Sequence, residues 1–373
     1  MSRYLRRQAP NGRFAVVTDE NDKKKVTAVG DVSARGPYGP RAHAPRPAPR
    51  SPAHGRWPQA RHYAALDLGT NNCRLLIARP QGQGFAVVDA FSRIVRLGEG
   101  LAATGRLSDE AIERTIAALR VCADKLKRRD VALARSVATE ACRRASNGPD
   151  FIQRAYRETG IMLDIISAEE EARLAVLGCH ALIEPGEGAA LVFDIGGGST
   201  ELVLIDTRSE TPAVLDWHSA PWGVVSLTES VGMSGTPSGA DGYARMRALV
   251  RDSFAPFAAR LPADVARRRL LGTSGTVTTL ASVHLGLDSY DRSAVDGLIM
   301  PAGAMRDVSR RIAGLDVAGR AKVPCIGPER ADLVVAGCAI LEEILDIWPA
   351  EQLGIADRGI REGILRRLMG TRK

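Results

Sequence analysis

A short pattern that occurs twice, at residues 66–74 and 193–201, limits the folds open to this chain more than any other feature. The copies read Leu-Asp-Leu-Gly-Thr-Asn-Asn-Cys-Arg and Phe-Asp-Ile-Gly-Gly-Gly-Ser-Thr-Glu, and their aspartates are 127 positions apart (194 − 67). In each copy an apolar run leads into Asp-apolar-Gly, and a second apolar run follows a charged residue. This order predicts a strand, a tight glycine-rich turn and a second strand. The repeat therefore predicts two α/β domains that begin with the same hairpin.

The segments around the two copies are typical of such domains. The first unit predicts further strands over 85–88, 91–97, 131–137 and 161–166, and helices over 109–127, 149–159 and 168–183. The second predicts strands over 213–217, 269–271 and 352–356, and helices over 244–261, 277–285, 329–347 and from 360 to 369. We expect domains at 61–186 and 187–373 with a ligand cleft between them, because α/β sheets bind ligands beyond the carboxyl ends of their strands. Whether the last helix packs back on the first domain stays open.

The first 60 residues differ from the rest in composition. They hold 12 Lys and Arg against four acidic residues, and eight of the 20 prolines, so this segment carries the whole net charge of +8. Such a composition predicts a disordered basic tail. It is typical of a solvated extension, and the alternative is a weak electrostatic contact with a polyanion such as RNA. No aromatic residues are interleaved as in nucleic-acid binding segments, so binding of nucleic acid is expected at most weakly and through the tail.

The remaining composition excludes several classes of protein. No apolar run approaches the roughly 18–20 residues that cross a bilayer, so no membrane association is expected. The six cysteines are scattered, which suits reduced thiols in the cytoplasm. The six histidines show no zinc-binding spacing.

Both turns have the chemistry of a phosphate and metal site. Consecutive N–H groups in a glycine-rich turn bind anions, and an aspartate at a strand end binds a cation. Two such turns facing each other would hold a phosphate chain and its metal. A third glycine-rich loop at 272–276 precedes a helix, and it serves either as an anion site or as a plain helix entry. The acids at 169–171 have a sufficient structural explanation, because acids in the first turn complement the helix dipole.

Six motifs, in order, resemble the exopolyphosphatase / guanosine pentaphosphate phosphohydrolase family of the actin–Hsp70–sugar kinase fold group. They lie at residues 67–71, 138–143, 167–173, 194–201, 272–276 and 359–363, and the resemblance covers the chain from about residue 62. It implies duplicated ribonuclease H-like, actin-like ATPase domains facing a central cleft. The chain resembles a short family member with two domains, since long members carry a further helical module. The chain departs from the family at Asn72, where a serine is usual, which puts one phosphate contact in doubt.

The resemblance also implies roles for single residues. Glu171 corresponds to the general base that activates water. The acidic pair Asp194 and Glu201 corresponds to the Mg²⁺ or Mn²⁺ ligands, and Asp67 in the first copy is added to them. The phosphate-binding residues are expected to be Gly69, Thr70, Asn71, Asn72, Arg143, Gly196, Gly197, Gly198, Ser199, Thr200, Gly275 and Thr276.

These residues predict a Mg²⁺-dependent cytoplasmic exopolyphosphatase that releases terminal orthophosphate from inorganic polyphosphate, in a cleft between domains. One alternative is the conversion of guanosine pentaphosphate, a nucleotide of the stringent response, to the tetraphosphate. Another is a sensor that binds these molecules without cleaving them. The family also implies a homodimer. Substrate preference, chain-length preference, processivity and the role of the tail are not legible in the sequence.

Overall fold

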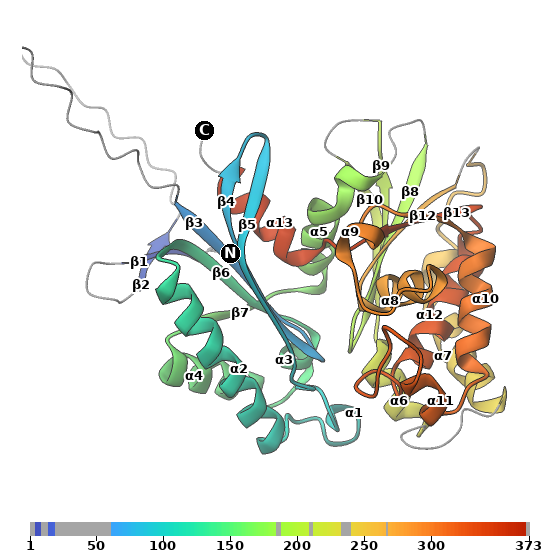
Figure 1. Cartoon of the computed structure of the whole chain (residues 1–373), viewed down its shortest axis with the longest axis horizontal. Coiled ribbons are helices and arrows are strands. Elements are labelled where there is room, and N and C mark those ends of the chain that lie inside the picture. Colours follow the sequence, from blue (N-terminus) through green and yellow to red (C-terminus); the bar gives the residue numbers. More distant parts are fainter. Residues whose placement is uncertain are drawn as a thin grey trace, which may run out of the picture.

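A computed structural model describes residues 4–8, 14–18, 61–183, 188–208, 212–232, 240–265 and 268–370. It contains two mixed β-sheets with helices on their faces, and two helices lie between the sheets (Figure 1). The predicted two-domain α/β fold is confirmed. The boundary expected between residues 186 and 187 lies outside the described residues, as does most of the segment expected to be disordered.

The two sheets repeat one topology. The first contains β3 (His62–Leu68), β4 (Asn72–Gln81), β5 (Gly84–Ile94), β6 (Val131–Ala138) and β7 (Leu163–Ile165), in the order β5-β4-β3-β6-β7. The second contains β8 (Ala189–Ile195), β9 (Thr200–Asp206), β10 (Ala213–Ala220), β11 (Arg269–Thr273) and β13 (Gln352–Ala356), in the order β10-β9-β8-β11-β13. In both, the first two connections are antiparallel hairpins and the fourth strand lies parallel to the first. The duplicated pattern in the sequence is therefore a duplicated sheet.

The two sheets differ in the additional strands that pair with them. In the second sheet, β12 (Ile299–Pro301) adds to β13. In the first, β1 (Tyr4–Gln8) and β2 (Phe14–Thr18) form a hairpin that pairs with β6. The two strands expected at 85–88 and 91–97 are one strand, β5, because a bulge absorbs the irregular stretch: Val88 of β5 is the extra residue between the partners of Ile77 and Ala78 in β4.

Helices cover the outer face of each sheet. On the first sheet these are α2 (Asp109–Arg128) and α4 (Gly148–Thr159). On the second they are α7 (Ala240–Ala258), α8 (Gly275–His284), α10 (Ala302–Ala313) and α12 (Val334–Ile347). Short helices complete the fold: α1 (Leu101–Thr104), α3 (Glu140–Arg144), α6 (Val224–Val231), α9 (Arg292–Val295) and α11 (Val317–Ala321).

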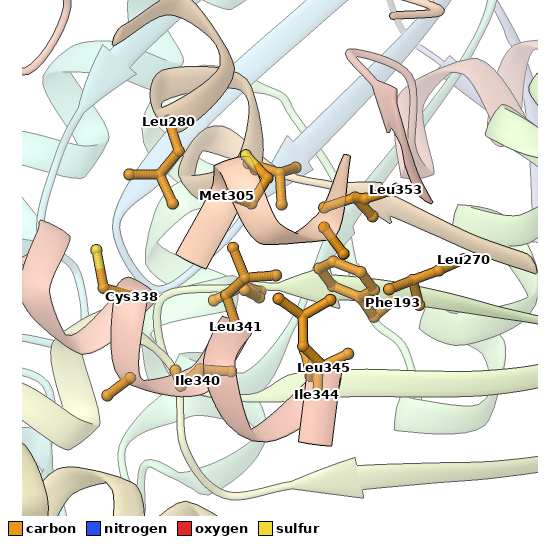
Figure 2. Packing of buried hydrophobic residues seen from close by; sticks show 14 of the residues in the cluster. Phe193, Leu270, Leu280, Met305, Cys338, Ile340, Leu341, Ile344, Leu345 and Leu353 are labelled. Carbon is orange, nitrogen blue, oxygen red and sulfur yellow. The ribbon is translucent and has the colours of Figure 1, made fainter. Parts of the chain in front are cut away.

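The core of the second domain is packed around α12. Figure 2 shows the Phe193 ring of β8 beside Leu270 and Leu345, in a cluster of buried apolar residues. Phe193 also lies over Gly272, where a Cβ would come within 2.5 Å of the ring. Close packing of the Phe193 ring therefore fixes the position of β8 next to Asp194.

The two inner helices connect the domains, because each of them packs on the sheet of the other domain. Helix α5 (Ala168–Cys179) follows the first sheet in sequence, yet its apolar face contacts β8 and β9 of the second. Helix α13 (Ile360–Gly370) ends the described chain and packs on β3 and β4 of the first. The two helices lie side by side (Figure 1). A Cβ on Gly178 would lie 2.0 Å from the carbonyl oxygen of Gly359, and one on Gly363 would lie 2.0 Å from the carbonyl oxygen of Leu174, so the close contact needs glycine at both positions. No helix in the described part of the chain is long and apolar enough to span a bilayer.

Candidate active site

The two predicted turns have the same geometry. The N–H of Gly69 donates to the carbonyl of Asn72 at 2.9 Å, and the N–H of Gly196 donates to the carbonyl of Ser199 at 2.9 Å. The charged residues on either side of each turn face each other across the hairpin: Asp67 pairs in register with Arg74, and Asp194 with Glu201. The second hairpin therefore ends in two carboxylates where the first ends in a carboxylate and a guanidinium.

Helix α6 binds the carbonyl groups of the second turn. The N–H groups of Val224 and Val225 donate to the carbonyls of Gly196 and Gly197, at 3.0 and 2.8 Å, and Ser226 Oγ donates to the Gly198 carbonyl at 3.0 Å. Within the described residues, the N–H groups of Gly197, Gly198 and Ser199 have no partner. With their carbonyls engaged on one side and their N–H groups unpaired, the turn is suited to binding an anion.

The turns meet at the centre of the molecule and line one cavity. A Cβ on Gly197 would lie 3.1 Å from the N atom of Asn71, and one on Gly198 would lie 2.6 Å from Thr70 Oγ1, so the two turns approach each other closely at these glycines. The cavity has a volume of about 130 Å³. Its lining includes Asp67, Gly69, Thr70, Asn71, Asn72, Arg74, Thr139, Glu140, Glu171, Asp194, Gly196, Gly197, Gly198, Ser199, Glu201, Ser274, Gly275, Thr276, Thr279, Arg330, Leu333 and Val334.

Contacts at the rim hold the two domains together over this cavity. The N–H of Gly100 in the first domain donates to Glu229 Oε1 on α6 at 2.9 Å. Arg96 forms an ion pair with Asp332 at 3.3 Å and donates to the carbonyl of Glu329 at 3.2 Å. These contacts therefore join the two domains beside the cleft.

Glu171 enters the cavity from the first turn of α5. Ser167 caps this helix by accepting the N–H of Glu170 at 3.2 Å, as the sequence predicts. Both terminal nitrogens of Arg143 donate to Glu171 Oε2, each at 3.2 Å, and Arg143 is held in turn by Glu140 and by the carbonyl of Ile166. Among the described residues none bonds Oε1 of Glu171, so this oxygen is free to accept a proton.

The acidic side chains of the cavity raise one another's pKa. Burial, followed by the charge of Glu201, raises the pKa of Glu171 well above its usual value, and Arg143 opposes this. Burial and Glu201 raise the pKa of Asp194 to about 8. Burial raises the pKa of Glu201 to about 7, although Ser199 and Ser219 donate to its Oε1 at 2.6 and 3.1 Å. Several carboxylates in one small cavity favour a bound cation.

The donor set fits a divalent metal ion only in part. Asp67 Oδ1 is buried without a hydrogen-bond partner in the described chain, as expected of an oxygen that awaits a ligand. However, no three acidic, histidine or cysteine side chains of the described residues converge closely enough to enclose an ion. Mg²⁺ is commonly bound by one or two carboxylates together with substrate phosphates and water. The residues present therefore fit an ion that binds together with a phosphate substrate.

Two predicted phosphate ligands lie outside the cavity lining. Thr200 is fully buried, and its hydroxyl donates to the carbonyl of Trp222 at 2.6 Å, so it supports the hairpin. Arg143 is occupied by Glu171 and Glu140 rather than directed at the phosphates. The other predicted site residues all line the cavity.

Some cavity residues were not singled out in the sequence. Arg330 lines the second-domain side and donates to Thr279 Oγ1 at 3.0 Å, and nothing in its local sequence marks it. Ser274 had a signal, since it stands in the third glycine-rich loop. It has φ 134°, its Oγ caps α8 by accepting the N–H of Thr276 at 3.2 Å, and it brings Gly275 and Thr276 to the cavity.

Comparison with known proteins gives consistent matches. The model of the Ppx/GppA phosphatase family matches residues 76–372. Exopolyphosphatase 2 of Mycobacterium tuberculosis is 34% identical over 321 residues, which cover 82% of this chain and 98% of that protein. A putative exopolyphosphatase of Haemophilus influenzae is 29% identical over 310 residues, covering 82% and 90%. The crystal structure of the Aquifex aeolicus Ppx/GppA family member superposes with a TM-score of 0.69 at 29% identity, over 84% of this chain and 99% of that chain.

Proposed function

We propose that this chain, which belongs to the Ppx/GppA phosphatase family, releases terminal orthophosphate from inorganic polyphosphate with the help of a divalent cation. The family makes the chain a phosphoanhydride hydrolase. The observation that carries the proposal is the position of Glu171, whose unbonded Oε1 shares one cavity with the unpaired N–H groups of two glycine-rich turns. A base and a set of anion-binding N–H groups in one cavity are what attack by water on a phosphate requires.

In the proposed mechanism the two turns bind the terminal phosphate. The N–H groups of Gly197, Gly198 and Ser199 face it from one domain, and those of Thr70 and Asn71 from the other. A water molecule between Glu171 and the phosphorus attacks in line. Its proton moves to Oε1 of Glu171, the bond from phosphorus to the bridging oxygen breaks, and the shortened chain leaves with that oxygen. Glu171 then returns its proton to the products or to solvent.

Arg143 orients the base in this scheme. Because it holds Oε2 from two nitrogens, Oε1 is the oxygen left for water. One or two carboxylates of the set Asp194, Glu201 and Asp67 would hold Mg²⁺ or Mn²⁺ together with the substrate phosphate and water, and the ion would neutralise charge on the phosphate oxygens. The raised pKa of Asp194, about 8, is consistent with a carboxylate that ionises fully only when a cation is near.

The cavity favours polyphosphate over guanosine pentaphosphate. Its volume of about 130 Å³ is below the roughly 300–1,000 Å³ of pockets for drug-sized ligands. No aromatic side chain of the described residues lines it, so nothing there stacks on a guanine base. Terminal phosphates fit this space better than a nucleoside does.

Phosphate release from polyphosphate and from guanosine pentaphosphate, measured side by side with Mg²⁺ or Mn²⁺ and with EDTA, tests the proposal. We expect faster release from polyphosphate and none in EDTA. Replacement of Glu171 with Gln should lower the rate on the order of 10²–10⁴-fold while the melting temperature is kept. Tight binding without release would instead make the protein a sensor.

The proposal extends to the setting of the enzyme, a homodimer in the cytoplasm. It is supported by the family and by cysteines that are all free among the described residues. Sedimentation at micromolar concentration tests the dimer.

A further inference from the structure

The guanidinium of Arg143 lies between two acids, Glu171 and Glu140, which come from different helices. Glu171 belongs to α5, whereas Glu140 is the first residue of α3 and also lines the active-site cavity. Nε and one terminal nitrogen of Arg143 donate to Glu140 Oε2, at 3.1 and 2.6 Å. The other terminal nitrogen donates to the carbonyl of Ile166 at 2.7 Å. Every nitrogen of this guanidinium is therefore held by a group other than Glu171.

The bonds from Arg143 to the base are longer and reach only one of its oxygens. Both terminal nitrogens donate to Oε2 of Glu171, each at 3.2 Å. An arginine and a carboxylate frequently pair through two parallel hydrogen bonds that use both carboxylate oxygens. That arrangement would occupy Oε1, the oxygen that the proposed mechanism leaves for water. The shorter bonds to Glu140 and Ile166 hold the guanidinium on the side of Oε2, so that Oε1 stays open.

Glu140 is itself fixed where the two domains meet. Its side chain packs against the second turn, where a Cβ on Gly198 would lie 2.9 Å from Glu140 Cγ. Its second oxygen, Oε1, forms an ion pair with Arg144 at 3.8 Å, and the side chain is 13% exposed. An acid in the first turn of a helix complements the helix dipole. That role needs neither burial nor an arginine that also binds the base, so it does not account for Glu140.

The charges around the base make the sharing of Arg143 important. Burial and the acids of the cavity raise the pKa of Glu171, and Arg143 lowers it. Burial disfavours the charged form of Arg143, but the charges of Glu171 and Glu140 raise its pKa, so it stays a cation. An arginine that was paired with Glu171 alone would make this carboxylate a weaker base. The acids that face Glu171 from the strands are Glu201, Asp67 and Asp194.

We propose that Glu140 is a positioning residue that keeps Arg143 from binding both oxygens of Glu171. This inference rests on the proposed function, because Glu171 is the base of that reaction. Glu140 acts through Arg143 and needs no contact with the attacking water. Without Glu140, the two terminal nitrogens of Arg143 turn onto Oε1 and Oε2 of Glu171. The base then loses the oxygen that accepts the proton from water.

The test compares Glu140→Gln and Glu140→Ala with Glu158→Gln. Glu158 is the matched control, because this exposed acid of α4 also pairs with two arginines, Arg154 at 2.7 Å and Arg120 at 2.6 Å, and does not line the cavity. The kcat of E140A on polyphosphate should fall about 10²-fold, as for a misplacement of about 1 Å. It should fall less in E140Q, whose amide oxygen still accepts from Arg143. KM and the Mg²⁺ concentration for half-maximal rate should stay within about twofold, and E158Q should match the wild type.

Two further measurements separate this role from a purely structural one. In E140Q the undivided charge of Arg143 lowers the pKa of Glu171, so the acidic limb of the pH profile of kcat should move to lower pH. Arg143→Gln removes that charge and should move the limb to higher pH. In the Arg143→Gln background, Glu140→Gln should change kcat by less than about twofold, because its effect runs through Arg143.

Three outcomes count against the inference in different ways. If the wild type cleaves polyphosphate and both Glu140 variants match E158Q, Glu140 does not position the base and the proposed function stands. If KM or the Mg²⁺ requirement changes as much as kcat, or if E140Q lowers kcat equally with and without Arg143, Glu140 acts directly on substrate or metal and the inference is refuted. If the wild type releases no phosphate from either substrate, the proposed function fails and the role of Glu140 fails with it. Circular dichroism shows that each variant is folded, and E140Q, which keeps the size of the side chain, decides the test if E140A does not fold.

Discussion

The contact between α6 and the second turn can be tested by a single methyl group. Gly223, which precedes α6, has φ −118°, a conformation open to any residue, so the requirement for glycine here is one of space. A Cβ at this position would lie 2.4 Å from the carbonyl carbon of Gly197 and 2.6 Å from the carbonyl oxygen of Gly196. These are backbone atoms, which cannot rotate away, so Gly223→Ala must separate the helix from the turn.

The expected size of the effect follows from the bonds that would be lost. Three backbone hydrogen bonds join α6 to the turn, from the N–H groups of Val224, Val225 and Ser226. At about 0.5–1.5 kcal/mol each, their loss lowers the free energy of unfolding by about 1.5–4.5 kcal/mol. Displaced carbonyls also turn the opposite N–H groups away from the phosphate. Removal of one such donor typically costs about 10²–10³ in rate, so phosphate release should fall at least that far.

Urea unfolding followed by circular dichroism and phosphate release from polyphosphate measure the two effects. Gly303→Ala is the matched control, because nothing lies within 4 Å of a Cβ at that position of α10. G303A should be as active as the wild type, with a free energy of unfolding unchanged or raised by less than about 1 kcal/mol. If G223A matched G303A in both measurements, the turn would not depend on α6 and the reasoning would be wrong.

Three further predictions follow from the site and the inner helices. Arg143→Gln removes the charge that lowers the pKa of Glu171, so the acidic limb of the pH–rate profile should move to higher pH, as read from initial rates between pH 5 and 9. In EDTA the protein should lose stability as the pH rises from 5 to 8. The folded-state pKa values of Asp194 (about 8) and Glu201 (about 7) exceed the values 3.8 and 4.5 of the free groups, so the folded state holds more protons in that range. Mg²⁺ at pH 8 should restore the melting temperature, and Asp194→Asn should flatten the pH dependence; a flat wild-type profile contradicts the raised pKa values. Gly363→Ala brings a methyl group 2.0 Å from the Leu174 carbonyl and should lower the free energy of unfolding by about 1–3 kcal/mol in urea, whereas an unchanged midpoint would show that α5 and α13 are not in close contact.

The duplicated hairpin, the turns and the acids at their ends were legible in the sequence because they depend on neighbouring residues. Glycine-rich turns and strand periodicity are local, so Asp67, Asp194 and Glu201 could be placed at strand ends before their distance was known. Two copies of one local pattern then indicated a shared ligand. The capped start of α5 was local in the same way and placed Glu171 near a helix N-terminus.

What the sequence could not show depends on contacts between distant segments. Arg143 follows a strand end, as a phosphate ligand would, but its direction is decided by Glu171, 28 residues later. The hydroxyl of Thr200 has the chemistry of a phosphate ligand, but it donates its hydrogen bond to the carbonyl of Trp222 instead. The pairing of α13 with the first sheet joins residues some 300 positions apart, which no local pattern predicts.

The exchange of inner helices sets an order of events during synthesis on the ribosome. Helix α13, which covers the inner face of β3 and β4, begins 279 residues after β4 ends (360 − 81). At roughly 5–20 residues per second, that face waits on the order of 14–56 s for its cover. Tyr63, Ala65 and Leu76 are buried in the finished protein, and during this interval α13 does not yet cover them. A chain that ends before residue 360 therefore lacks the helix that covers this apolar sheet face, and the exposed face favours aggregation.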